Sequence, residues 1–105
     1  RAVWAIPNPP VGILDALAMD TNPLVRRGAA AHPNTRLPTL RQMAGDSDVG
    51  VVQAVASHPH ADRDLLMLLA FDDRDAQVRL TAQDRLEPLL RREIRDDILE
   101  RWEAN

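Results

Sequence analysis

The feature that most constrains this chain is a repeat of 26 residues. When the sequence is shifted by 26 positions, four columns of identical residues superpose. The columns are Pro7, Pro33 and Pro59; Leu14, Leu40 and Leu66; Ala18, Ala44 and Ala70; and Asp20, Asp46 and Asp72. Units this short cannot bury their apolar faces alone, so neighbouring copies must stack around one continuous core. The sequence therefore predicts a solenoid.

Each repeat begins with a short helix. Asn22 and Asp48 carry side chains that accept hydrogen bonds from the free N–H groups of a first helical turn. A proline ends each helix, because the residue before a proline is pushed out of the helical region. Together these signals predict helices over residues 23–31 and 49–57.

A second helix follows in each repeat. In the middle copy it carries Leu40, Met43 and Ala44 at i, i+3 and i+4, which forms one apolar stripe. We expect Thr35 to cap this helix and Asp62 to cap its equivalent in the next copy. The three equivalent leucines, at positions 14, 40 and 66, should line the shared core.

The array is expected to end soon after a third helix start at Asp75, which comes one residue late relative to the period. After Pro88 the chain becomes charged and carries apolar residues four positions apart, typical of an amphipathic helix. These residues are Leu90, Ile94, Ile98 and Trp102. The helix expected around residues 65–69 is apolar on all sides and must be covered. We expect the terminal helix to cover it, with a partner or a second copy as the alternative.

The domain organisation follows from the repeat. Residues 1–86 are predicted to form the repeats and residues 87–105 a C-terminal amphipathic capping helix. The repeats are a partial first copy, copies near residues 22–47 and 48–74, and a partial last copy at residues 75–86. Because the chain starts at Arg1, inside a first helix, we expect a repeat-domain fragment of a larger protein.

Composition excludes several classes of function. The chain has no cysteine, so thiolate zinc sites and cysteine-ligated clusters are excluded, and we expect no cofactor and no metal. A net charge of -3 disfavours sequence-independent binding to nucleic acid. With no signal peptide and no apolar run long enough for a bilayer, we expect a cytoplasmic protein with no membrane contact. All 13 basic residues are arginine, which indicates a GC-rich bacterial genome.

The string VRRGAAAHPNT at residues 25–35, followed by L-x-x-M-A-x-D, resembles the bacterial leucine-rich repeat variant family, a relative of HEAT repeats. The similarity covers about residues 1–86. The resemblance implies an all-α fold in which α and 3₁₀ helices alternate along a right-handed superhelix. The family has no established catalytic residues to carry over, so we do not expect an enzyme. The third copy departs from the pattern, since Val52 and Gln53 replace Arg26 and Arg27.

Two constellations suggest chemistry but have a structural interpretation. His58, His60 and Asp62 match the H-x-H-x-D string of metallo-hydrolases, which raises catalysis at this cluster as an alternative. However, His58 is the copy of His32 one repeat earlier, and a histidine at a helix C-terminus favours the negative end of the dipole. The aspartate column recurs once per repeat instead of converging on one substrate, which indicates turn and cap carboxylates.

The function is predicted as a class. We expect a module for protein–protein interaction or scaffolding, because solenoids bind partners at the columns that vary between repeats. The candidate binding residues are Arg27, Arg36, Arg41, Gln53 and Arg79. An arginine-rich strip favours an acidic peptide through charge-assisted hydrogen bonds. The alternatives are nucleic-acid binding on an arginine-lined face, similar to HEAT-like alkylpurine DNA glycosylases, and a homodimer formed through the C-terminal helix.

Overall fold

The structure, a computed structural model, describes residues 10–71 and 74–104. The helices are α1 (Val11–Leu17), α2 (Pro23–Ala31), α3 (Leu37–Met43), α4 (Val49–Ser57), α5 (Arg63–Ala70) and α6 (Ala76–Ala104). No strand occurs among the described residues, and the all-α prediction is confirmed. The bounds of α2 and α4 are those expected from their caps and prolines.

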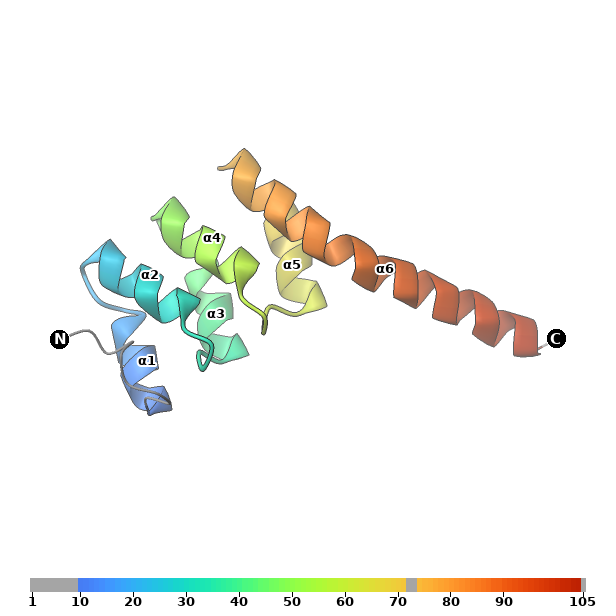
Figure 1. Ribbon diagram of the computed structural model, residues 1–105, viewed down its shortest axis with the longest axis horizontal. Helices are drawn as coiled ribbons and strands as arrows, with labels where there is room; N and C mark the ends of the chain where they lie inside the picture. The colour runs from blue at the N-terminus through green and yellow to red at the C-terminus, as the bar shows by residue number, and fades with distance from the viewer. Residues whose placement is uncertain (1–9, 72–73, 105) are drawn as a thin grey trace.

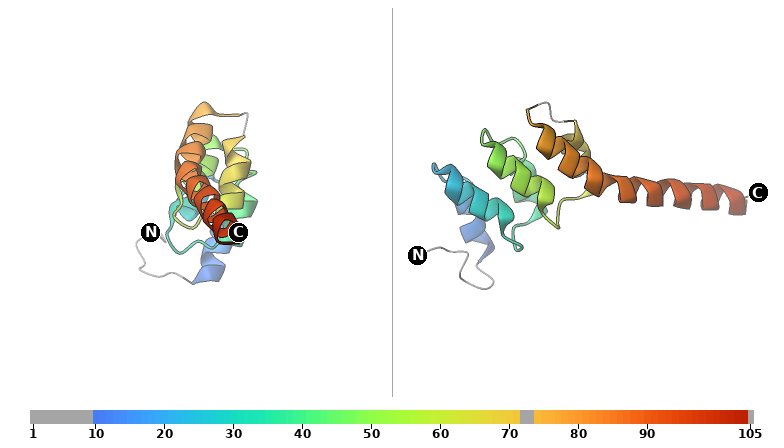
Figure 2. Two further views of the ribbon diagram at one scale, coloured as in Figure 1. Left: turned by 90° about the vertical axis from the view of Figure 1, so that its right-hand side faces the viewer. Right: turned by 45° about the horizontal axis from the view of Figure 1, so that its top comes forward.

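The helices lie in two layers along an elongated molecule. One layer contains α2, α4 and the first half of α6 side by side, and the other contains α1, α3 and α5 (Figures 1 and 2). The principal dimensions are 60 × 30 × 17 Å. The arrangement is thus a row of helix pairs, as expected for units that are each covered by the next.

The core follows the repeat. Leu14, Leu40 and Leu66, which occupy equivalent positions in α1, α3 and α5, are almost completely excluded from solvent. The alanine column at Ala18, Ala44 and Ala70 is also buried. Leu40 and Leu66 belong to one continuous apolar core, which confirms the expectation for these two leucines.

The helix starts agree with the expected caps except at α3. The side chains of Asn22 and Asp48 accept from the backbone N–H of Leu24 and Gly50, and Asp62 caps α5. The prediction for Thr35 is wrong. Its hydroxyl donates 2.5 Å to the carbonyl of Ala29, because the side chain is buried under the end of α2 instead of facing α3.

The expectation of 3₁₀ helices is also wrong for the described residues, where every helix is α. The hydrogen bond from Leu40 N to Arg36 O and that from Ala44 N to Leu40 O span four residues, at 3.0 and 2.9 Å. The apolar stripe of α3 has i, i+3, i+4 spacing, which fits 3.6 residues per turn, whereas a 3₁₀ helix would turn such a stripe away from the core.

The predicted start of a separate terminal helix after Pro88 is wrong, because α6 continues through this proline. Proline removes one backbone hydrogen bond, and Figure 2 shows a bend in this part of α6. Most flanking residues are strong helix formers, which favours continuation.

The cover over α5 also differs from expectation. It comes from the first half of α6, where Val78, Ala82 and Leu86 are buried. Of the residues that were expected to provide the cover, Leu90 is partly buried and packs against the core, whereas Ile94, Ile98 and Trp102 are exposed. Leu68 of α5 is exposed as well.

Candidate interaction surface

The five candidate residues fall into two groups on different layers. Arg27 and Gln53 occupy the same register position on α2 and α4, and Arg79 lies one residue before that position on α6. Arg36 precedes α3 and Arg41 lies within it. The structure therefore places three candidates along the first layer and two on the second, instead of in one continuous strip.

Arg27 is bound within the protein. Its guanidinium donates two hydrogen bonds to Asp48, at 2.7 and 2.9 Å, and this contact joins α2 to the start of α4. The hydrogen bond from Arg27 lowers the pKa of the Asp48 carboxyl and raises the pKa of Arg27 itself. The side chain passes over Gly50, where an added Cβ would lie 2.2 Å from the Arg27 Nε. The absence of a side chain at Gly50 thus leaves room for the Arg27 guanidinium to reach Asp48.

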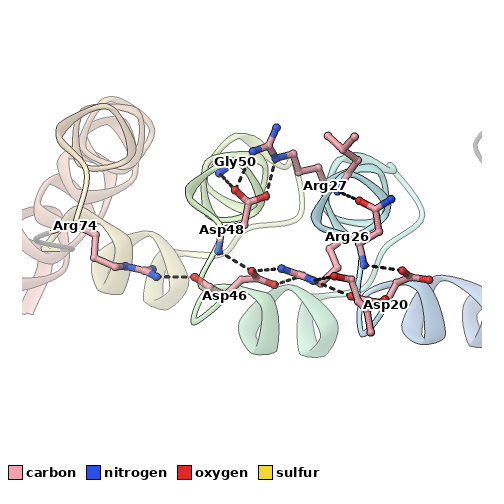
Figure 3. A network of polar contacts seen from close by, with 10 residues as sticks. Asp20, Arg26, Arg27, Asp46, Asp48, Gly50 and Arg74 are labelled. Atoms are coloured by element: carbon pink, nitrogen blue, oxygen red, sulfur yellow. Dashed lines mark hydrogen bonds and ion pairs between the residues drawn. The ribbon is translucent and has the colours of Figure 1, made fainter.

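Arg26 holds a turn between repeats (Figure 3). Its Nε and Nη2 donate to the two carboxylate oxygens of Asp46, at 2.8 and 3.1 Å. Its Nη1 donates to the carbonyl of Asp20 at 2.8 Å, and the Asp20 carboxylate accepts from the backbone N–H of Asn22. Asp46 likewise accepts from the N–H of Asp48. Asp20 and Asp46 are therefore turn carboxylates, as expected, while Asp72 lies outside the described residues.

Two further arginines bind loop carbonyls, and sequence reasoning missed both. Arg74 donates to the carbonyls of Asp46 and Ala44, at 2.6 and 3.2 Å. Arg85 of α6 donates to those of Ala56 and His58, at 2.8 and 2.6 Å. The last carbonyls of a helix lack partners inside the helix, which is the signal that a donor must come from elsewhere. That signal does not identify the donor, because Arg74 and Arg85 are not at equivalent repeat positions.

Of the remaining candidates, Arg41 and Gln53 each form a hydrogen bond to the next helical segment of their layer. Arg41 of α3 donates 2.9 Å to Asp62, which precedes α5. Gln53 of α4 donates 3.0 Å to the Thr81 hydroxyl of α6, while its buried Oε1 lacks a hydrogen-bond partner among the described residues. Arg36 is exposed. Arg27, Arg41 and Gln53 are thus bound to neighbouring repeats within the protein.

The histidines serve as helix ends. His32 and His58 are the C-terminal caps of α2 and α4, and both are buried. His58 Nε2 lies 2.7 Å from the carbonyl of His32, and its Nδ1 accepts from the N–H of His60. Burial lowers the pKa of His58. Among the described residues, no three His, Cys, Asp or Glu side chains are grouped as ligands for a metal ion.

Several large apolar side chains are exposed on the second half of α6. Ile94, Ile98, Leu99 and Trp102 are all more than half exposed. A shallow hollow of about 320 Å³ on this helix is lined by Leu86, Leu90 and Ile94, together with Gln83, Glu87 and Arg91. None of the helices in the described part of the chain has the length and apolarity that crossing a bilayer requires.

Comparison with known proteins agrees with the repeat. Residues 23–48 match the family model described as leucine rich repeat variant. Comparison with curated proteins and with solved structures gives no match. The matched segment contains α2, α3 and the turn that Arg26 and Asp46 close. The resemblance is confirmed for residues 23–48, which are similar to one repeat of the leucine-rich repeat variant family.

Proposed function

We propose that this chain is a module for protein–protein interaction or scaffolding and has no catalytic role. The observation that carries the proposal is the side-by-side stacking of α2, α4 and α6, which presents equivalent positions in series along one layer (Figure 1). Repeat arrays of this kind offer extended surfaces to other proteins. The right-handed winding of the array, the division at residue 86 and a cytoplasmic location belong to the same proposal.

Nucleic acid is the less favoured partner. Arg27 and Arg41 are each paired with an aspartate of the next repeat, which leaves less positive charge available for phosphates. The overall charge of -3 acts in the same direction. A protein partner needs no such surplus of positive charge.

Display selection tests the proposal. The 105-residue chain is immobilised and exposed to a phage-displayed library of natural bacterial protein fragments. We expect at least one fragment whose Kd weakens fivefold or more in Arg27→Gln, Gln53→Ala, Arg36→Glu or a variant of α6. Retained circular dichroism shows that each variant is folded. The proposal fails if no fragment is enriched, or if every enriched fragment binds all variants equally.

A further inference from the structure

Polar contacts join α2 to α4 at both ends of α4. At the N-terminal end, the guanidinium of Arg27 donates two hydrogen bonds to the Asp48 carboxylate, at 2.7 and 2.9 Å (Figure 3). At the C-terminal end, the ring of His58 reaches the carbonyl of His32, with 2.7 Å between Nε2 and the oxygen. The two ends of this joint therefore depend on different chemical groups.

The hydrogen bonds of His58 determine which ring nitrogen carries the proton. Nδ1 accepts from the backbone N–H of His60, at 3.0 Å, so this nitrogen carries no proton. In the neutral ring the single proton is therefore on Nε2, which donates it to the His32 carbonyl. A second proton would have to bind Nδ1, where it would face the His60 N–H. The neutral ring thus satisfies both contacts, whereas the imidazolium satisfies only one.

The surroundings of His58 also oppose a positive charge. The residue is only 2% exposed, so an imidazolium at this place would have little contact with water. Three basic groups face it, which are His32 at the end of α2, His60 in the following loop and Arg85 of α6. Arg85 is held there by its hydrogen bonds to the carbonyls of Ala56 and His58. Burial, together with these basic neighbours, lowers the pKa of His58.

The N-terminal end of the joint keeps its charges at mildly acidic pH. Arginine stays protonated, and the ordinary pKa of an aspartate is about 4. The hydrogen bond from Arg27 lowers the pKa of Asp48 further. Acidification to about pH 4.5 therefore acts on His58 at one end of α4 and leaves the Arg27–Asp48 pair intact at the other.

We infer that the joint between α2 and α4 is a pH-sensitive hinge, in which protonated His58 leaves its site and the two helices separate at their C-terminal ends only. By moving outward the imidazolium gains water and leaves its three basic neighbours, and its contact with the His32 carbonyl is lost. The Arg27–Asp48 pair holds the opposite end, so the repeats change their relative angle instead of coming apart. This inference goes beyond the proposed function, because it concerns the shape of the array and requires no partner.

Paired spin labels test the hinge, since the chain has no cysteine and labels can be attached at chosen positions. Ala31→Cys with Ser57→Cys labels the C-terminal ends of α2 and α4, and Thr21→Cys with Ser47→Cys labels the chain just before these helices. All four positions are exposed and each pair spans one repeat, so the pairs are matched. Between pH 7.5 and pH 4.5, we expect the dipolar broadening in EPR spectra to fall reversibly and at least twofold for the first pair. The second pair should show no change.

Two further measurements assign the change to His58. His58→Gln keeps a donor and an acceptor on the side chain but cannot be protonated, so it should abolish the pH dependence of the first pair. In the chain with native His58, NMR spectra of the imidazole should show the proton on Nε2 at pH 7.5, and their titration gives the pKa of His58. The midpoint of the EPR change should coincide with this pKa, which decides the matter even if circular dichroism shows that His58→Gln does not fold.

Several results would overturn the inference. These are a proton on Nδ1 at pH 7.5, a pKa of His58 outside the range from 4.5 to 6.5, and an EPR signal of the first pair that does not follow the titration of His58. An equal change in both pairs would mean cooperative unfolding instead of a hinge. None of these results bears on the interaction module, because the display selection does not depend on His58.

Discussion

The stacked repeats and the second half of α6 use their charged residues differently. In the repeats, Arg26, Arg27 and Arg41 each bind an aspartate about 20 residues later, so each ion pair joins one helix pair to the next. In the second half of α6, the ion pairs Glu87–Arg91 and Asp97–Arg101 stay within one helix, and Arg63–Glu93 joins this half to the start of α5. The comparison shows that ion pairs in the repeats join successive helix pairs, whereas most of those in the second half of α6 lie within that helix.

The largest difference is expected for apolar truncations. Leu40→Ala removes a fully buried side chain from the centre of the array and should lower the free energy of unfolding by about 3 kcal/mol. Leu68→Ala changes an exposed leucine on α5 and should cost less than about 0.5 kcal/mol. Urea unfolding followed by circular dichroism measures both. Equal losses for the two variants would contradict the shared core.

The next effect concerns the turn held by Arg26. Arg26→Ala leaves Asp46, which is largely buried, without its bidentate partner, and we expect a loss of about 2 to 3 kcal/mol. Asp46→Ala should lower the free energy of unfolding much less in the Arg26→Ala background than in the wild type. A double-mutant cycle measures this coupling. Strict additivity of the two losses would show that the ion pair does not stabilise the array.

Stability should also depend on pH through His58. Burial lowers the pKa of His58 in the folded state, so between that pKa and the ordinary value of about 6.5 the unfolded state binds more protons. The contribution of neutral His58 to the free energy of unfolding is therefore fully present above pH 6.5, and it is lost as the pH falls from there through the lowered pKa. Protonation would also remove the Nδ1 acceptor for the His60 N–H.

Urea midpoints between pH 8 and pH 5 measure this dependence. His58→Gln should flatten the decline, because it removes the group whose pKa burial lowers. An unchanged slope in His58→Gln would assign the decline to other groups.

The smallest effect is expected in the second half of α6. Trp102→Ala removes an exposed indole and should change the free energy of unfolding by less than about 0.5 kcal/mol, although the side chain is large. A large loss of stability in Trp102→Ala would mean that this side chain packs on the repeats.

Some of the fold could be read from single residues and their neighbours. Asn22 and Asp48 predicted the starts of α2 and α4, and the following prolines predicted their ends, because caps and prolines act within a few residues. The interpretation of His58 as a helix end followed from its equivalence to His32. Local signals were misleading at Thr35, whose buried environment decides its hydrogen bond.

The candidate site was less predictable. Arg27 and Arg41 were selected because their columns vary between repeats, but variation does not distinguish a binding residue from one that joins neighbouring helices. Arg74 and Arg85 had no periodic counterpart that would mark them. The row Leu90, Ile94, Ile98 and Trp102 was visible in the sequence, but the expectation that it packs on the repeats holds only for Leu90, and the other three residues are exposed.

The sequence by itself determined the repeat of 26 residues, the short helices and the buried leucine column, since these depend on the spacing of apolar, capping and proline residues along the chain. Only the tertiary structure decided which arginines are bound, that α6 continues through Pro88, and which half of its apolar row is open. These outcomes depend on the residues that stacking brings together, and stacking joins side chains that lie 20 or more residues apart.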